Sequence, residues 1–307
     1  MRQMTMAVAA MVLCAPMAVA QGYEFVGYGN ILNNDYYGDG RDRWQTGSDQ
    51  LSLVWSNGWE KGWKDQLTSG FGDTIELRFG ARVAAPDNID IPANDDRRYA
   101  GVLSLGLVTH MAVAQDYQMA LGAGVEAVGP GTALDEFHAK FHSLIGSGDA
   151  SAAVRDDQIG DKITPYASFE MARTFPTGGN SRIRPFVEAH SGLETLARVG
   201  LDFHVGDLPL NGLMSRDYVT GQTYQTVRGT GTGWTFIGGA DVAKVTQSAL
   251  LPSDEYTLTP ARVRARVAVQ WAGNYGVAQF GLTYLGKEFE QQDNGQVLGS
   301  ISFKYDF

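Results

Sequence analysis

The C-terminal end of the chain alternates between apolar and polar side chains with a period of two. From Val297 to Phe307, apolar or aromatic residues at every second position alternate with polar residues such as Ser300, Ser302 and Lys304. Such a period is typical of a strand with one apolar and one polar face. The segment has about the ~9–11 residues that a tilted strand needs to cross a bilayer. The pattern therefore predicts a final transmembrane strand.

An earlier segment carries the same period with charges on its polar face. Val263, Val267 and Trp271 share one face, and Arg264 and Arg266 share the other. An apolar face opposite a charged face is typical of a membrane barrel with a wet interior. A soluble β-sandwich also alternates, so this pattern alone leaves both architectures open.

Strand patterns recur along most of the chain, and we expect about twelve antiparallel strands in one all-β domain, residues 21–307. The expected strands lie near residues 23–32, 50–55, 74–83, 101–110, 118–128, 163–174, 182–189, 197–205, 222–228, 235–241, 263–271, 275–286 and 297–307. The polar intervals 86–98 and 146–161 are expected to be loops, and loops of this length are often functional.

Residues 130–145 break the strand pattern. Apolar residues recur there at helical spacing after a proline, and a polar stripe lies beside them. The apolar set is Leu134, Phe137, Phe141 and Leu144, and the polar stripe is Asp135, His138 and His142. The sequence therefore predicts a short helix inserted in the barrel, packed on protein or lining a cavity.

The N-terminal residues 1–20 have the layout of a secretory signal peptide. Arg2 precedes an apolar run, and Ala-Val-Ala precedes Gln21, so cleavage is expected after Ala20. The only cysteine, Cys14, lies in this segment, which excludes disulfides and thiolate catalysis in the mature chain. A final strand ending in Phe307 resembles the signal read by the outer-membrane insertion machinery. Together these ends favour a Gram-negative outer-membrane β-barrel over a soluble sandwich.

Composition and charge narrow the function. The net charge of −10 argues against a nucleic-acid partner. No stretch approaches the ~18 consecutive apolar residues of a transmembrane helix. The 38 glycines fit many strands joined by turns.

Four short stretches occur in a definite order along the N-terminal half. They are Asn34-Asp35 followed by DRWQTG at 42–47, PANDDRRYAG at 92–101, GPG at 129–131 leading to His142, and DDQI at 156–159. In this order they resemble blocks of the outer-membrane lipid A 3′-O-deacylase family (LpxR type). The chain departs from that family at Arg98, where proline is usual, at His138, where glutamine is more common, and at 154–155, where Val-Arg replaces Gly-Trp.

The resemblance implies a twelve-stranded barrel with its active site on the wall near the outer leaflet. The family hydrolyses the ester that holds the 3′ acyloxyacyl chain of lipid A, so lipopolysaccharide is the implied partner and Ca²⁺ the implied cofactor. By position, His142 is the implied catalytic histidine, and Asn34 and Asp35 belong to the implied site.

The residues fit ester hydrolysis by activated water. No G-x-S-x-G elbow is present, so a serine nucleophile has little support. His142 is the candidate general base. A hard cation could polarise the carbonyl from oxygen ligands on Asp35, Asn34 or Asp149. The simpler alternatives are a solvated histidine on a helix and an ordinary Asn-Asp turn before glycine.

Several neighbours have supporting roles in this hypothesis. His138 could orient His142, or the two could bind a transition metal at i, i+4 spacing. Asp135 could accept a hydrogen bond from His138 or simply stabilise the helix start. Arg97 and Arg98 are candidate contacts for the lipid A phosphates.

The sequence leaves two other functions open. One is a passive or structural barrel that has lost the activity. The other is a different lipid-active barrel, such as a phospholipase or a palmitoyl transferase.

Overall fold

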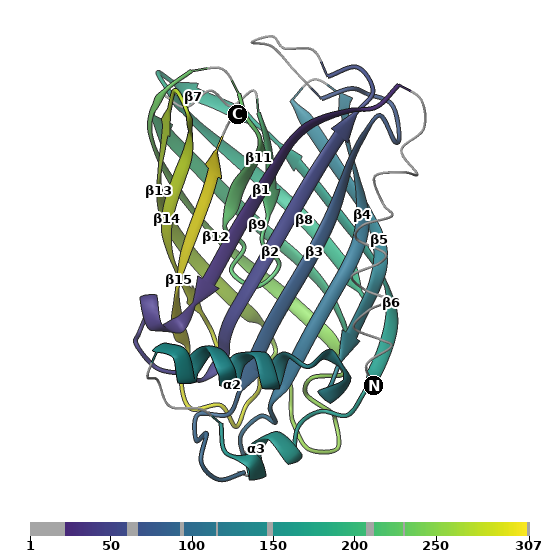
Figure 1. The fold of residues 1–307 in the computed structure, drawn as a ribbon. Coiled ribbons are helices and arrows are strands. Elements are labelled where there is room, and N and C mark those ends of the chain that lie inside the picture. The colour runs from purple at the N-terminus through teal and green to yellow at the C-terminus, as the bar shows by residue number, and fades with distance from the viewer. Residues whose placement is uncertain are drawn as a thin grey trace.

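The computed structural model describes residues 22–59, 67–92, 95–114, 116–145, 150–206, 212–229 and 231–305. They form one closed antiparallel β-barrel (Figure 1). The wall strands are β1 (Glu24–Asn34), β2 (Trp44–Ser56), β3 (Thr74–Ala85), β4 (Ala100–Ala114), β5 (Tyr117–Val128), β6 (Lys162–Arg173), β7 (Phe175–Gly178), β8 (Ser181–Ser191), β9 (Glu194–Gly206), β12 (Gly233–Ser248), β13 (Arg262–Gly273), β14 (Gly276–Leu285) and β15 (Gln296–Tyr305). The expected signal peptide and Phe307 lie outside the described residues.

The barrel has twelve strands, because β6 and β7 are two parts of one strand that both pair with β8. The seam between the first and last strands is closed by β1 and β15, where Leu32 lies opposite Ile301. The expected all-β barrel is confirmed. No helix among the described residues is both long and apolar enough to cross a membrane.

Burial in the wall is inverted relative to a soluble protein. On β13, Arg264 and Arg266 are buried in the lumen, whereas Val263, Val267 and Trp271 are exposed. The exposed apolar face suits lipid, and the buried polar face suits a polar interior. This inversion excludes the soluble sandwich, whose strands would turn their apolar face inward.

The two ends of the barrel differ. One end, here called the turn end, includes short turns. An example is the two-residue turn that joins Gly273 of β13 to Gly276 of β14, two residues that pair with each other. The opposite end, here called the loop end, carries the connections 35–43, 86–99, 129–161, 249–261 and 286–295. In outer-membrane barrels the longer loops are extracellular.

The expected wall strand at 222–228 is wrong, because this segment lies inside the barrel. β10 (Leu213–Arg216) and β11 (Thr223–Val227) form a two-stranded hairpin. In sequence the hairpin lies between β9 and β12, which pair directly with each other in the wall. We call residues 212–229 the plug hairpin. Every residue of β11 is buried, and β11 lies against β1. A Cβ on Gly29 of β1 would meet the Gln225 carbonyl oxygen at 2.6 Å, so this approach requires glycine in the wall.

Polar contacts hold the plug hairpin to several strands of the wall. Gln50 of β2 donates to the Tyr224 hydroxyl at 2.8 Å, and Gln279 of β14 donates to the Thr223 carbonyl at 3.0 Å. The Arg264 guanidinium of β13 donates to the Tyr218 carbonyl at 2.8 Å. A cavity of about 130 Å³ remains beside the hairpin. The hairpin therefore occupies part of the lumen.

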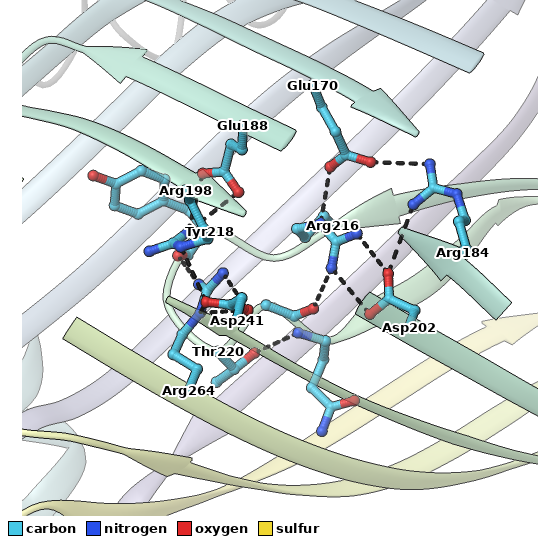
Figure 2. Close-up of polar contacts among 12 residues, drawn as sticks. Glu170, Arg184, Glu188, Arg198, Asp202, Arg216, Tyr218, Thr220, Asp241 and Arg264 are labelled. Atoms are coloured by element: carbon cyan, nitrogen blue, oxygen red, sulfur yellow. Dashed lines mark hydrogen bonds and ion pairs between the residues drawn. The ribbon is translucent and has the colours of Figure 1, made fainter. Parts of the chain in front are cut away.

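Ion pairs surround the hairpin (Figure 2). Arg216 donates to Asp202 of β9 at 2.7 Å and to Glu170 of β6 at 2.8 Å. Arg264 donates to Asp241 of β12 at 2.9 Å. Removing charges from water is costly unless they are paired and hydrogen-bonded, and these arginines and carboxylates satisfy one another.

The insert between β5 and β6 begins as the sequence predicts and then differs. A 3₁₀ turn, η3 (Pro130–Thr132), leads into helix α2 (Leu134–Ile145). The interval expected to be only loop contains a second helix, α3 (Ala152–Asp156), whose first turn is capped when the Ser151 side chain accepts from the Val154 amide. The sequence missed α3 because five residues are too few for a recognisable helical period.

Candidate active site

Helix α2 lies at the loop end, across the outer face of the wall (Figure 1). A Cβ on Gly101 of β4 would meet the Leu134 Cβ at 2.8 Å. Gly101 shares its face of β4 with Leu107, which is 55% exposed on the lipid side. The helix therefore packs on the outside of the barrel.

The entry to α2 is set by the Gly129-Pro130-Gly131 turn. Gly129 has φ 110°, and a Cβ there would lie 2.7 Å from the Asp161 backbone. The Gly131 amide donates to the Asp161 carboxylate at 2.6 Å. The turn thus fixes the direction in which the helix, with His138 and His142, leaves the wall.

Asn34 and Asp35 lie where β1 runs into the 3₁₀ turn η2 (Asp35–Tyr37). The Asn34 side chain caps this turn, because its oxygen accepts from the Tyr36 amide at 2.8 Å. Its amide nitrogen donates to the Thr46 carbonyl at 3.1 Å. Asn34 therefore joins the end of β1 to the start of β2.

Asp35 is only 2% exposed. The pKa of its carboxyl is raised to about 8, first because of burial and then because of the nearby carboxylates of Asp42 and Asp39, while a hydrogen bond from the Arg43 amide at 2.9 Å opposes this rise. Three acidic side chains thus lie close together, with Asp35 buried, Asp42 half-buried and Asp39 exposed. Such a group favours either protonation or a cation.

Asp42 connects the Asn34-Asp35 block to helix α2. One of its oxygens accepts from the Thr46 hydroxyl, which also reaches Asp35. Its other oxygen lies 3.3 Å from Nδ1 of His142. His142 itself is 5% exposed. The N-terminal block and the helix histidine, distant in sequence, therefore meet in one site.

His138 stands one turn before His142 and stacks near it. The two ring centroids are 4.0 Å apart, and the His138 ring lies 6.3 Å from that of Tyr99. One ligand atom from each of Asp42, His138 and His142 can be chosen so that all lie within 4.8 Å of one another.

The other predicted residues lie as follows. Arg97 is 2% exposed and pairs with Glu288, so of the two arginines only Arg98 reaches the surface, where it pairs with Glu255 at 2.7 Å. Asp135 accepts from Gln158 at 3.2 Å. Asp149 lies outside the described residues.

Sequence reasoning did not single out Asp42 and Thr46 as site residues. The signal was present, because both lie in the DRWQTG stretch that carries the family resemblance. Large apolar side chains flank the site. Tyr36 is 76% exposed and Phe137 is 66% exposed, next in sequence to Asp35 and His138.

Comparisons with known proteins agree with this architecture. The family described as "Outer membrane protein LpxR" matches residues 4–307. No protein with a curated description matches the sequence. LpxR from Salmonella typhimurium superposes with a TM-score of 0.75 at 14% identity, covering 92% of this chain and 100% of that one. That likeness is one of fold. The β domain of the Bordetella autotransporter BrkA gives a TM-score of 0.48 at 13% identity, covering 94% and 100%.

Proposed function

This chain belongs to the LpxR family of outer membrane proteins, and from that premise we propose that it is a hydrolase that removes the 3′-linked acyloxyacyl chain of lipid A. The observation that carries the proposal is the position of Asp42. It contacts both the Asp35–Thr46 group and His142. A general base for ester hydrolysis therefore lies beside a cluster of oxygen donors.

The surroundings suit a lipid substrate. The loop end of the barrel corresponds to the extracellular side, where lipid A forms the outer leaflet. The exposed Tyr36, Tyr37 and Phe137 side chains offer apolar surface for acyl chains beside the polar residues. A site beside the outer face of the wall would receive its substrate from the membrane itself.

In the proposed mechanism His142 activates water. Nδ1 faces Asp42, so Nε2 takes a proton from the water as its oxygen attacks the ester carbonyl. The negative charge of Asp42 favours the imidazolium that forms. His142 then returns the proton to the departing 3′ oxygen of the sugar, and the acyl chain leaves as a carboxylic acid. No residue is acylated.

The residues fit a hard cation such as Ca²⁺. The donors are carboxylate oxygens of Asp35, Asp39 and Asp42. A divalent cation would offset the repulsion among these carboxylates, which, after burial, raises the pKa of Asp35. Asp35 and Asp42 are the residues that would hold it. When bound, such an ion stabilises the negative charge that develops on the carbonyl oxygen.

The plug hairpin bears on the passive-channel alternative. Its residues contact strands on opposite sides of the wall, Gln50 of β2 and Asp202 of β9, so the hairpin crosses the lumen and obstructs a path for solutes. A barrel with a hairpin in its lumen and with Asp42, His138 and His142 gathered beside a helix on its outer face is better suited to acting on lipid.

Mass spectrometry of lipid A tests the proposal after expression in a Gram-negative host that lacks such an activity. We expect loss of a 3′ acyloxyacyl unit, and we expect His142→Ala or a chelator to abolish that loss. Lys140→Ala, a change to an exposed residue of the same helix, is the matched control. Unchanged lipid A would refute the proposal, and acyl loss from phospholipid would indicate a phospholipase instead.

A further inference from the structure

Helix α2 presents two histidines on one side. His138 and His142 are four residues apart, so they lie one above the other on adjacent turns. Their ring centroids are 4.0 Å apart, and both ring nitrogens of His138 are shielded from solvent. Histidines at i, i+4 on a helix are a recurrent arrangement for binding zinc.

The third member of the cluster is Asp42, from the connection between β1 and β2. Its Oδ2 is 3.3 Å from the His142 Nδ1. In a tetrahedral zinc site with bonds of about 2.1 Å, neighbouring ligand atoms lie about 3.4 Å apart. The whole set lies within 4.8 Å, so side-chain adjustments of about 1 Å would complete three-quarters of such a coordination shell.

Asp42 is also oriented for this role. Its other oxygen accepts from the Thr46 hydroxyl, which leaves Oδ2 directed at the histidine. Hydrogen bonds of this kind fix the orientation of the residues that bind a metal and raise its affinity.

We propose that Asp42, His138 and His142 form a site for a borderline-soft divalent transition metal such as Zn²⁺. Two imidazole nitrogens suit such an ion, whereas Ca²⁺ and Mg²⁺ prefer oxygen. An ion bound to Nδ1 of His142 keeps the ring's own proton on Nε2, the nitrogen that takes the proton from water in the proposed mechanism, so His142 can no longer act as the base. This inhibitory consequence rests on the proposed hydrolase function, whereas the binding itself does not.

Binding is tested on the full barrel in detergent micelles, stripped of metal and titrated with Co²⁺, whose visible absorption reports low-coordinate nitrogen and oxygen ligation. We expect intense bands for the unmodified protein and at least about tenfold weaker binding for His138→Gln and for Asp42→Asn. Replacing even a residue that only hydrogen-bonds to a metal ligand lowers metal affinity about 10–100-fold. Glu136→Gln, a change to an exposed acid on the same helix, should bind as the unmodified protein does. Equal binding by His138→Gln, or no saturable binding at all, overturns the site.

A second measurement follows lipid A hydrolysis at fixed Ca²⁺ while Zn²⁺ is added, each variant being compared with its own rate without Zn²⁺. Inhibition of the unmodified protein and resistance of His138→Gln support the proposal. Binding of Co²⁺ without inhibition by Zn²⁺ contradicts the claim that the ion blocks His142. Absence of hydrolysis under all conditions contradicts the proposed function, and the Co²⁺ spectra then decide the metal site alone.

Discussion

Arg216 is the residue whose replacement should release the plug hairpin. Its guanidinium donates to Asp202 at 2.7 Å, to Glu170 at 2.8 Å and to the Gly221 carbonyl at 3.0 Å. It also lies over the Phe186 ring, 3.7 Å from the centroid. Arg216→Met keeps much of the apolar stem and removes all three donations.

The magnitude follows from burial. Removing one partner of a buried ion pair costs about 3–5 kcal/mol. Glu170 retains a hydrogen bond from Arg184 at 2.9 Å, and Asp202 retains Arg266, so we expect the lower end, about 3 kcal/mol. At about 1.4 kcal/mol per factor of ten, the docking equilibrium of the hairpin falls about 100-fold.

Conductance across planar bilayers measures this change. The unmodified barrel should conduct little, and Arg216→Met should open far more often. Arg182→Met is the matched control, because Arg182 is a similarly buried lumen arginine whose described hydrogen bond is to His204 of the wall. Unchanged conductance in Arg216→Met would refute the reasoning. An equal rise in both variants would show that loss of any lumen charge suffices.

Four further predictions concern the site. Asp42→Asn should lower the hydrolysis rate constant about 100-fold with little change in KM, because misplacing a catalytic group by about 1 Å costs about that much. Equal changes in the rate constant and in KM would contradict an orienting role for Asp42 toward His142. Because the pKa of Asp35 is raised to about 8, Ca²⁺ binding should release a proton and should weaken as pH falls below that value. Calorimetry in buffers of different ionisation enthalpy would detect the released proton. Proton release that persists in Asp35→Asn would disprove the assignment of this proton to Asp35. In the metal-free protein the same raised pKa favours the folded state below the ordinary value of 3.8, and this contribution is lost as pH rises through about 8. Gly129→Ala should strain the turn by about 1–3 kcal/mol and lower activity by displacing α2, while circular dichroism still reports an intact barrel; full activity would mean that the turn tolerates a side chain.

Much of the wall could be predicted from the sequence because lipid and lumen impose opposite polarity on alternate residues. The plug hairpin could not, because residues Thr223–Val227 are buried on both faces. Their side chains suit a strand, and nothing local distinguishes a strand that borders lipid from one that crosses the lumen.

The candidate site was only partly predictable. His142 and Asp35 could be found through the family resemblance, and their meeting was an expectation that depended on the fold. Asp42 looked like one more acidic residue in a turn. Only the closure of β1 onto β2, together with the packing of α2 on β4, brings its carboxylate within 3.3 Å of the histidine.

The plug hairpin also couples the last step of barrel assembly to the filling of its interior. The hairpin leaves the wall between β9 and β12, yet β11 lies against β1, and Gln279 of β14 binds it from the other side of the seam. Until β1 meets β15, these partners cannot surround it together. Closure of the seam and docking of the hairpin therefore stabilise each other. In an intermediate with an open seam the hairpin is undocked and the lumen is open to solutes.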